Sequence, residues 1–113
     1  MRSDQERLQD ILEAIAQVER YTSQGRDRFN QDELIQIWIV HHLQIIGEAA
    51  SKLSQPFIKQ HPEIPWAAVV AFRNILVHQY FRVDFEIVWR IVEYDLPDLK
   101  SRVQTFVQQG DNE

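Results

Sequence analysis

Apolar residues recur every three or four positions near the start of the chain, and polar residues fill the positions between them. The apolar stripe comprises Leu8, Ile11, Leu12, Ile15 and Val18. This spacing is typical of one face of a helix, and Ser3 followed by Glu6 is a capping-box pattern that marks its start. Gly25 is suited to a left-handed stop. We therefore expect an amphipathic helix that ends near Ser23, followed by a short loop at 26–29.

The segment 34–46 is different, because its apolar residues surround the helical axis instead of forming one stripe. Asn30, with Glu33 three residues later, predicts the start of a second helix that runs from about 31 to 53. A helix that is apolar on every side must be covered on every side. In a chain of 113 residues some of that cover should come from a partner chain, so we expect this helix to help form a homodimer interface. Gly47 inside it suits a place where another backbone approaches closely.

The second half of the chain predicts further helices separated by prolines. Residues 54–65 contain three of the four prolines and indicate a connector with a short helical piece. Pro65 suits the first turn of a third long helix, Asp84 caps the next one, and Pro97 breaks or kinks the path before a last amphipathic segment. There is no alternating strand pattern. We expect an all-α fold, an up-and-down bundle of four to five helices in one domain that spans residues 1–113.

Composition narrows the class of protein. The chain has no cysteine, which excludes disulfides and thiolate metal sites. No apolar run approaches the roughly 18 residues of a membrane span, and the amino terminus lacks a signal-peptide core, so we expect a cytoplasmic protein without a membrane contact. The net charge of -5 argues against broad, non-specific binding of nucleic acid. Any contact with RNA must be local, and the candidate arginines are Arg26, Arg28, Arg73, Arg82 and Arg90.

The stretch Arg73-Asn74-Ile75-Leu76-Val77-His78-Gln79-Tyr80 brings a cation, an amide, an imidazole and a phenol together near the end of a helix. On a helical wheel Arg73 and Tyr80 lie within roughly 20° of each other, whereas His78 lies about 140° from Arg73. One rigid helix therefore cannot aim all four groups at one small target. Either the helix ends near His78 and turns, or two copies of it meet across a two-fold axis.

This stretch resembles the R-x4-H-x-Y signature of the HepT toxins within the HEPN superfamily, and the resemblance covers most of the chain. It is supported by Ile46-Gly47-Glu48-Ala49-Ala50, Ile64-Pro65-Trp66 and Asp95-Leu96-Pro97. The resemblance implies an all-helical homodimer with endoribonuclease toxin activity toward RNA, tRNA having been assigned as a target in this family. It also implies that a neighbouring minimal nucleotidyltransferase, MntA, acts as the antitoxin by transferring AMP from ATP onto the motif tyrosine, here Tyr80.

Physical chemistry gives each motif residue a role in such a reaction. RNA carries its own nucleophile, the 2′-hydroxyl, so the enzyme needs positioning, proton transfer and charge stabilisation, and no metal or other cofactor. His78 would take the proton from that hydroxyl or give one to the leaving 5′-oxygen. Arg73 would hold the phosphate through a two-pronged contact. Asn74, one helical turn before His78, would orient the imidazole or the substrate.

One motif histidine per chain leaves one of the two proton-transfer roles unfilled, and a two-fold axis would supply the second histidine. This favours a composite site built from two chains. Tyr80 shares a helix face with Arg73, so an AMP group on Tyr80 would place a phosphodiester anion where RNA should bind.

Two other interpretations remain open. The chain could be a non-catalytic helical interaction module that is the partner and AMP acceptor of a nucleotidyltransferase. It could also be a helical scaffold in which the motif only packs, with Arg73 in an interhelical salt bridge, for example to Glu48. His41 and His42 are adjacent and point about 100° apart, so they do not predict a shared metal site. With glycines only at 25, 47 and 110, the chain has no phosphate-cradling loop and does not itself resemble the ATP-binding partner.

Overall fold

In the computed structural model of the chain, the described residues are 2–78 and 84–111, and the side chains of 75–78 and 111 are not described. All regular structure in these two ranges is helical, which confirms the predicted all-α class. The elements are α1 (Asp4–Thr22), α2 (Arg26–Gln31), α3 (Glu33–Ser51), α4 (Gln55–Gln60), α5 (Trp66–His78), α6 (Phe85–Arg90), the π-helical turn η1 (Ile91–Asp95) and α7 (Leu96–Asp111).

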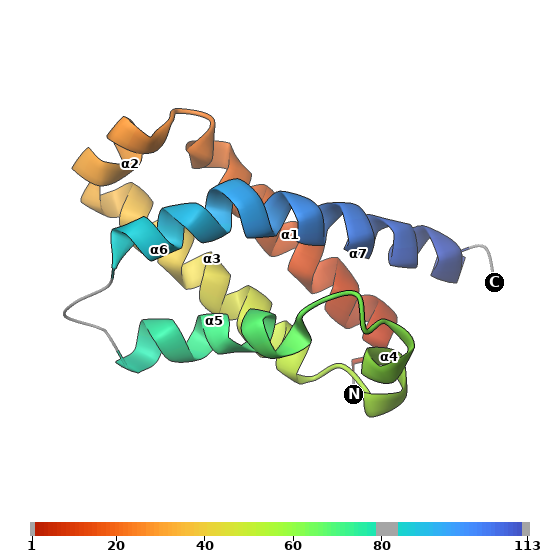
Figure 1. Cartoon of the computed structure of the whole chain (residues 1–113). Helices are drawn as coiled ribbons and strands as arrows, with labels where there is room; N and C mark the ends of the chain where they lie inside the picture. Colours follow the sequence, from red (N-terminus) through yellow and green to blue (C-terminus); the bar gives the residue numbers. More distant parts are fainter. Residues whose placement is uncertain (1, 79–83, 112–113) are drawn as a thin grey trace.

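Helix α3 is the centre of the arrangement (Figure 1). It packs against α1 and also against α5, and α1 in turn packs against α7. Segments α6, η1 and α7 follow one another without a break and form one long rod across the front of the molecule (Figure 1). Four long rods thus make up most of the described fold, and the short helices α2 and α4 lie at its two ends. None of the described helices is long and apolar enough to cross a membrane.

The predicted start of the first helix is confirmed in detail. The Ser3 hydroxyl accepts a hydrogen bond from the Glu6 backbone N–H at 3.1 Å, and the Glu6 carboxylate accepts one from the Ser3 N–H at 3.0 Å. Gly25 adopts a φ of 92°, which side chains rarely tolerate. It directly precedes α2, however, so it serves as the entry to the next helix as well as the end of α1.

Two local predictions in this region are wrong. Residues 26–29 belong to helix α2 and do not form a loop, because Phe29 is 1% exposed and packs its ring 5.3 Å from that of Trp89. Burial of this aromatic side chain outweighs the weak local preference of a polar stretch. The cap of α3 is Asp32 and not Asn30, since Asn30 lies within α2. The Asp32 carboxylate accepts hydrogen bonds from the backbone N–H groups of the next helix at 3.0 and 3.3 Å.

Pro97 does not end the helix but follows a local change in its hydrogen-bonding pattern, so of the two expected outcomes, a break or a kink, the break is not found. The π turn η1 comes directly before it, with the Leu96 N–H donating to the Ile91 carbonyl five residues earlier. Pro97 then lies in the first turn of α7. A wider turn at this point accommodates a ring that would otherwise clash with the carbonyl four residues before it.

Helix α3 is only partly covered by its own chain. Ile39 and Ile46 are completely buried, as a core helix requires. Leu34 and Ile37, by contrast, are 78% and 58% exposed. The chain therefore leaves part of the apolar surface of α3 open to solvent. This agrees with the prediction of a partner chain that covers α3, which stays a prediction.

Candidate functional site

Two residues of the sequence motif, Arg73 and Asn74, lie on α5 where it runs beside α3. Together with side chains of α3 they line an open groove of about 450 Å³. Its lining residues are His41, Gln44, Ile45, Glu48, Arg73 and Asn74, and we call it the α3–α5 groove. Five of the six side chains are polar, so the groove offers both charge and hydrogen-bonding groups.

Gly47 determines how closely α5 approaches α3 at this groove. A Cβ atom added at Gly47 would lie 2.8 Å from the Arg73 backbone nitrogen and 3.1 Å from the Val70 carbonyl oxygen. The first contact is shorter than packed atoms allow and the second is unusually tight, so a larger residue would push α5 away. The prediction that another backbone approaches Gly47 is confirmed, and that backbone belongs to Arg73.

The Arg73 guanidinium is tied to α3 by two hydrogen bonds. Its Nη1 donates to Glu48 Oε2 at 2.9 Å and to the Ser51 hydroxyl at 3.1 Å. This is the interhelical ion pair that the packing interpretation of the motif expects. The Arg73 side chain nevertheless stays 37% exposed, so it combines a structural contact with access to the groove. Nothing in the described ranges accepts a hydrogen bond from its Nε or Nη2.

The other two motif residues are described less fully or not at all. His78 is the last residue of α5, but its side chain is not described. Tyr80 lies outside the described residues. The position of either side chain relative to Arg73, and the choice between a turn after His78 and a pair of facing helices, therefore stay predictions.

The neighbouring histidines of α3 face different surroundings, as their 100° separation predicts. His41 is exposed and lines the α3–α5 groove. His42 is only 8% exposed, and its Nδ1 lies 2.7 Å from the Trp38 carbonyl oxygen. In the part of the chain that the structure describes, no three His, Cys, Asp or Glu side chains are grouped as metal ligands. Sequence reasoning had not placed His41 or Gln44 in the site, although their three-residue spacing on the Glu48 side of α3 could have indicated it.

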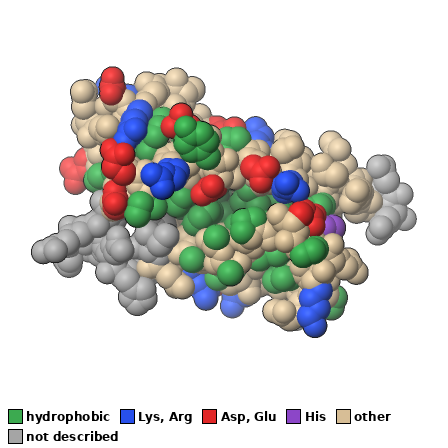
Figure 2. Space-filling view, viewed as in Figure 1, with side chains coloured by type: hydrophobic (Ala, Val, Ile, Leu, Met, Phe, Trp, Pro, Cys, Tyr) green, Lys and Arg blue, Asp and Glu red, His purple; other side chains and the backbone are tan. Residues whose placement is uncertain are grey.

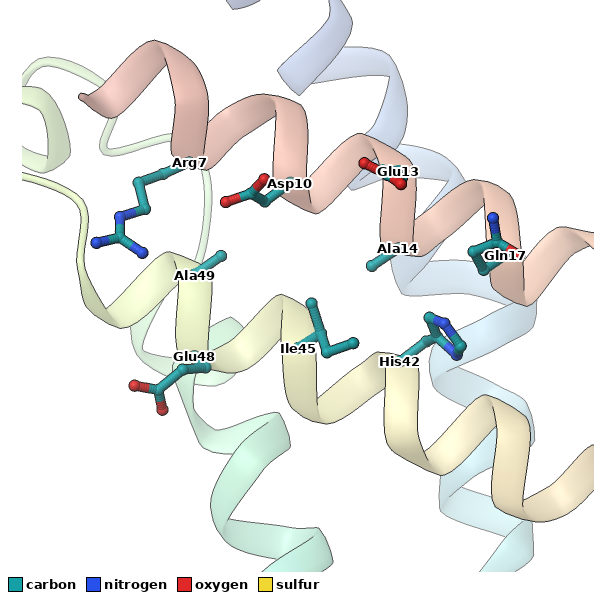
Figure 3. A pocket seen from close by; sticks show the side chains of 9 residues that line it. All are labelled: Arg7, Asp10, Glu13, Ala14, Gln17, His42, Ile45, Glu48 and Ala49. Carbon is teal, nitrogen blue, oxygen red and sulfur yellow. The ribbon is translucent and has the colours of Figure 1, made fainter. Parts of the chain in front are cut away.

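A second groove, of about 360 Å³, lies between α1 and α3. Figure 3 shows Arg7, Asp10, Glu13 and Gln17 of α1 along one side of this groove and His42, Ile45, Glu48 and Ala49 of α3 along the other. Ile45 and Glu48 line this groove as well as the α3–α5 groove. Helix α3 therefore separates the two grooves. We call its more accessible side chains the α3 ridge: Leu34, Ile37, His41, Ile45 and Glu48.

A third groove lies on the face shown in Figure 2, where hydrophobic side chains gather in a hollow between α5 and α7. It measures about 290 Å³ and includes Phe72, Tyr94 and two acids, Asp95 and Asp98. Burial raises the pKa of the Asp95 carboxyl, with a smaller contribution of the same sign from Asp98. The nearby Arg90 opposes both effects.

The predicted arginine patch is weakened by local ion pairs. Arg26 pairs with Glu86, and Arg28 pairs with Asp32 at 3.1 Å. Arg82 lies outside the described residues. Of the five candidate arginines, Arg73 is the one that lines a described groove.

A helical chain with a motif arginine open to a groove fits the class of small all-α HEPN-like proteins. Comparison with known families agrees, because the family described as "Ribonuclease HepT-like" matches residues 11–106. The chain belongs to the HepT-like ribonuclease family.

Curated relatives in two archaea match over nearly their whole length. A Thermococcus cleftensis protein named as a probable ribonuclease HepT is 38% identical over 104 residues, which cover 91% of this chain and 94% of the relative. A Methanocaldococcus jannaschii protein with a provisional RNase name is 36% identical over 98 residues, covering 86% of this chain and 90% of the relative. No solved structure matches the chain.

Proposed function

We propose that this chain is the toxin of a toxin–antitoxin pair and acts as a metal-independent endoribonuclease, with tRNA as its substrate. The observation that carries the proposal is the position of Arg73, partly exposed at the α3–α5 groove beside Asn74, in a chain of the HepT-like ribonuclease family. The single domain would extend over residues 1–113.

In this proposal the substrate phosphate binds Arg73, whose charge stabilises the negative charge that builds up on the phosphate oxygens. His78 transfers protons to or from the reacting oxygens, which a group with an ordinary pKa near 6.5 does well at neutral pH. Asn74 orients the imidazole or the substrate. Because the 2′-hydroxyl of RNA is the nucleophile, these protein groups are sufficient without a metal ion.

The proposed enzyme is a homodimer with a site built from both chains. The α3 ridge supports this, because its exposed Leu34 and Ile37 continue along α3 to His41 and Glu48 at the α3–α5 groove. A second copy that covered the ridge would remove apolar surface from water. It would also bring a second motif histidine toward the groove, which provides the missing proton-transfer group.

The proposed antitoxin is a minimal nucleotidyltransferase of the MntA type, which transfers AMP from ATP to Tyr80. The phosphodiester anion of a modified Tyr80 would compete with RNA for the Arg73 guanidinium. Intact-mass measurement of the chain after incubation with this partner and ATP should show a gain of one or more AMP units. The Tyr80→Phe variant should keep its unmodified mass.

RNA cleavage by the purified chain tests the catalytic proposal. Arg73→Ala and His78→Ala should each slow cleavage by about 10²-fold or more, because a lost proton-transfer group or charge contact costs that much. Arg102→Ala is the matched control, since it removes an equally exposed arginine that pairs with Asp98 on α7. Full cleavage and toxicity in His78→Ala with an unchanged oligomeric state would contradict the proposal.

A non-catalytic interaction module is the second candidate function. The ion pair between Arg73 and Glu48, which the packing interpretation expects, also fits this candidate, because it gives Arg73 a structural role that needs no RNA. This candidate predicts AMP transfer to Tyr80 without any RNA cleavage by the wild-type chain. The mass and cleavage experiments together therefore separate the two functions.

A further inference from the structure

Among the described residues, the contacts that hold the Arg73 guanidinium are all at one end of it. Both of its hydrogen bonds, to Glu48 and to Ser51, start from Nη1. Nε and Nη2 form the adjacent edge of the same planar group, and no described residue accepts from them. This edge presents two parallel N–H groups, which is the geometry that matches two oxygens of a phosphate.

We propose that Glu48 is a positioning residue for Arg73, an inference that rests on the proposed ribonuclease function. Glu48, helped by Ser51, fixes Nη1 and thereby presents the Nε–Nη2 edge to a phosphate in the α3–α5 groove. An arginine side chain without such an anchor samples many rotamers, and a misplaced charge stabilises a transition state poorly.

The anchor is rigid because its parts come from one stretch of helix α3. Gly47, Glu48 and Ser51 lie within about one and a half turns of α3. Gly47 holds the Arg73 backbone against α3, and the other two residues hold its side chain. Both ends of the arginine are thus fixed by the same element, and sites built on helices keep their geometry better than sites on loops.

A carboxylate next to a phosphate site also repels the phosphate, so the negative charge of Glu48 must be compensated by nearby cations. Glu48 Oε2 contacts Arg73, and Glu48 Oε1 lies 3.8 Å from the Lys52 ammonium. The carboxylate therefore has a cation beside each oxygen. Figure 3 shows the Glu48 side chain on the side of α3 away from Arg7 and Asp10. Its Oε2 contacts Arg73, although Glu48 also lines the α1–α3 groove.

Single-turnover cleavage of a short RNA by the full chain tests this inference. Glu48→Ala should lower the cleavage rate at saturating RNA by about tenfold or more. The protein concentration that gives half of the maximal rate should change by less than about threefold, because an oriented arginine acts mainly in the transition state. Glu48→Gln keeps an oxygen acceptor for Nη1 and should restore part of the rate. Glu86→Ala, which removes the exposed partner of Arg26 far along the chain, is the control and should cleave like the wild type.

The double variant distinguishes positioning from a general effect on the fold. In the Arg73→Lys background, the added Glu48→Ala change should alter the rate by less than about threefold, because there is no guanidinium left to orient. If the rate loss of the double variant equals the product of the two single losses, then Glu48 acts independently of Arg73. If Glu48→Ala cleaves faster than the wild type, then the Glu48 carboxylate competes with the phosphate. Either result overturns the inference.

Failure of the inference can be told apart from failure of the proposed function. If Arg73→Ala abolishes cleavage but Glu48→Ala cleaves at the full rate, then only the positioning role is wrong. If the wild-type chain cleaves no RNA, or Arg73→Ala cleaves normally, then the ribonuclease proposal itself fails and the positioning role fails with it.

Discussion

Arg73 shows how one residue can satisfy two interpretations of a sequence motif. A salt bridge in the folded chain is usually taken as evidence for packing, and exposed pairs of this kind contribute only about 0–1 kcal/mol to stability. The contact with Glu48 uses one nitrogen of the guanidinium and leaves the side chain 37% exposed at a groove. The pair therefore contributes little to stability, and the proposed function assigns the remaining edge of the guanidinium to the substrate phosphate.

Asp95 is a second single residue that gives a prediction, here about how the stability of the fold depends on pH. Partial burial raises the pKa of its carboxyl in the folded chain, and because the side chain is still exposed, the ionised form destabilises the fold only slightly at neutral pH. Asp95→Asn should therefore raise the melting temperature at pH 7. The difference should disappear below the ordinary pKa of aspartate, about 3.9, where the carboxyl is protonated in both states.

Thermal unfolding of both proteins at several pH values would check the Asp95 prediction. Asp98→Asn serves as the comparison, because Asp98 is ion-paired with Arg102 at 3.2 Å and its replacement removes a favourable contact. An Asp95→Asn variant that melted below the wild type at pH 7 would contradict the prediction.

The proposed roles of Arg73 and His78 also predict how cleavage responds to a chelator. Cleavage of a short single-stranded RNA should change by less than about twofold in excess EDTA, since no role is left for a metal ion. A magnesium-dependent nuclease in the same buffer is the control for complete chelation. Loss of cleavage that returns on adding a divalent cation would rule out the metal-independent mechanism.

At the scale of elements, the packing of α5 on α3 depends on one glycine. The α5 backbone reaches α3 at Gly47, and the same contact places Arg73 at the groove. Gly110 in α7 provides a contrast, because its nearest neighbour is the far end of the flexible Gln5 side chain. The two helical glycines should therefore respond differently to the same substitution.

Gly47→Ala should destabilise the fold by about 1–3 kcal/mol, although alanine favours a helix by about 1 kcal/mol over glycine, because α5 must move away. Gly110→Ala should stay within about 0.5 kcal/mol of the wild type, since the helix preference of alanine offsets the hydrogen bond from Gln5 to the Val107 carbonyl that is lost when the Gln5 side chain turns aside. Denaturant unfolding at one fixed protein concentration measures both. Equal changes in the free energy of unfolding at the two positions would show that the close contact between α5 and Gly47 does not contribute to stability.

Helix boundaries illustrate which elements local sequence can predict. The Ser3 capping box and the Asp84 cap were predicted correctly, since a cap depends on residues within one turn of it. Helix α2 was missed because its stability depends on Phe29 packing against Trp89, sixty residues further along the chain. The π turn before Pro97 was missed too, because a proline in a helix pattern indicates a disturbance but not its form.

At the scale of the whole molecule, the α3 ridge is an apolar surface that the single chain does not fully bury. Helix α3 is covered by α1 and α5 on its flanks, while Leu34 and Ile37 remain exposed. A second copy on this ridge would complete the burial of a helix that is apolar on every side. The composite site of the proposed function depends on this assembly.

The double variant Leu34→Glu with Ile37→Glu tests the assembly. Charged residues on the ridge should make the chain monomeric and should slow RNA cleavage by about tenfold or more, because the site would lose the second chain. Light scattering after size exclusion gives the oligomeric state. Tyr94→Ser, which alters another exposed apolar side chain on η1, is the control and should leave the oligomeric state unchanged. A ridge variant that stays dimeric and active would contradict the proposed interface.

The sequence by itself determined the helical class, the starts of α1 and α6, the close approach at Gly47 and the resemblance to the HepT-like family. These features depend on residues near one another in the chain or on a short motif. Tertiary structure decided the rest: that Phe29 orders α2, that α3 separates two grooves, and that Glu48 and Ser51 both accept from Nη1 of Arg73. Helical periodicity gives the face on which a side chain lies, whereas its partner depends on how distant helices pack.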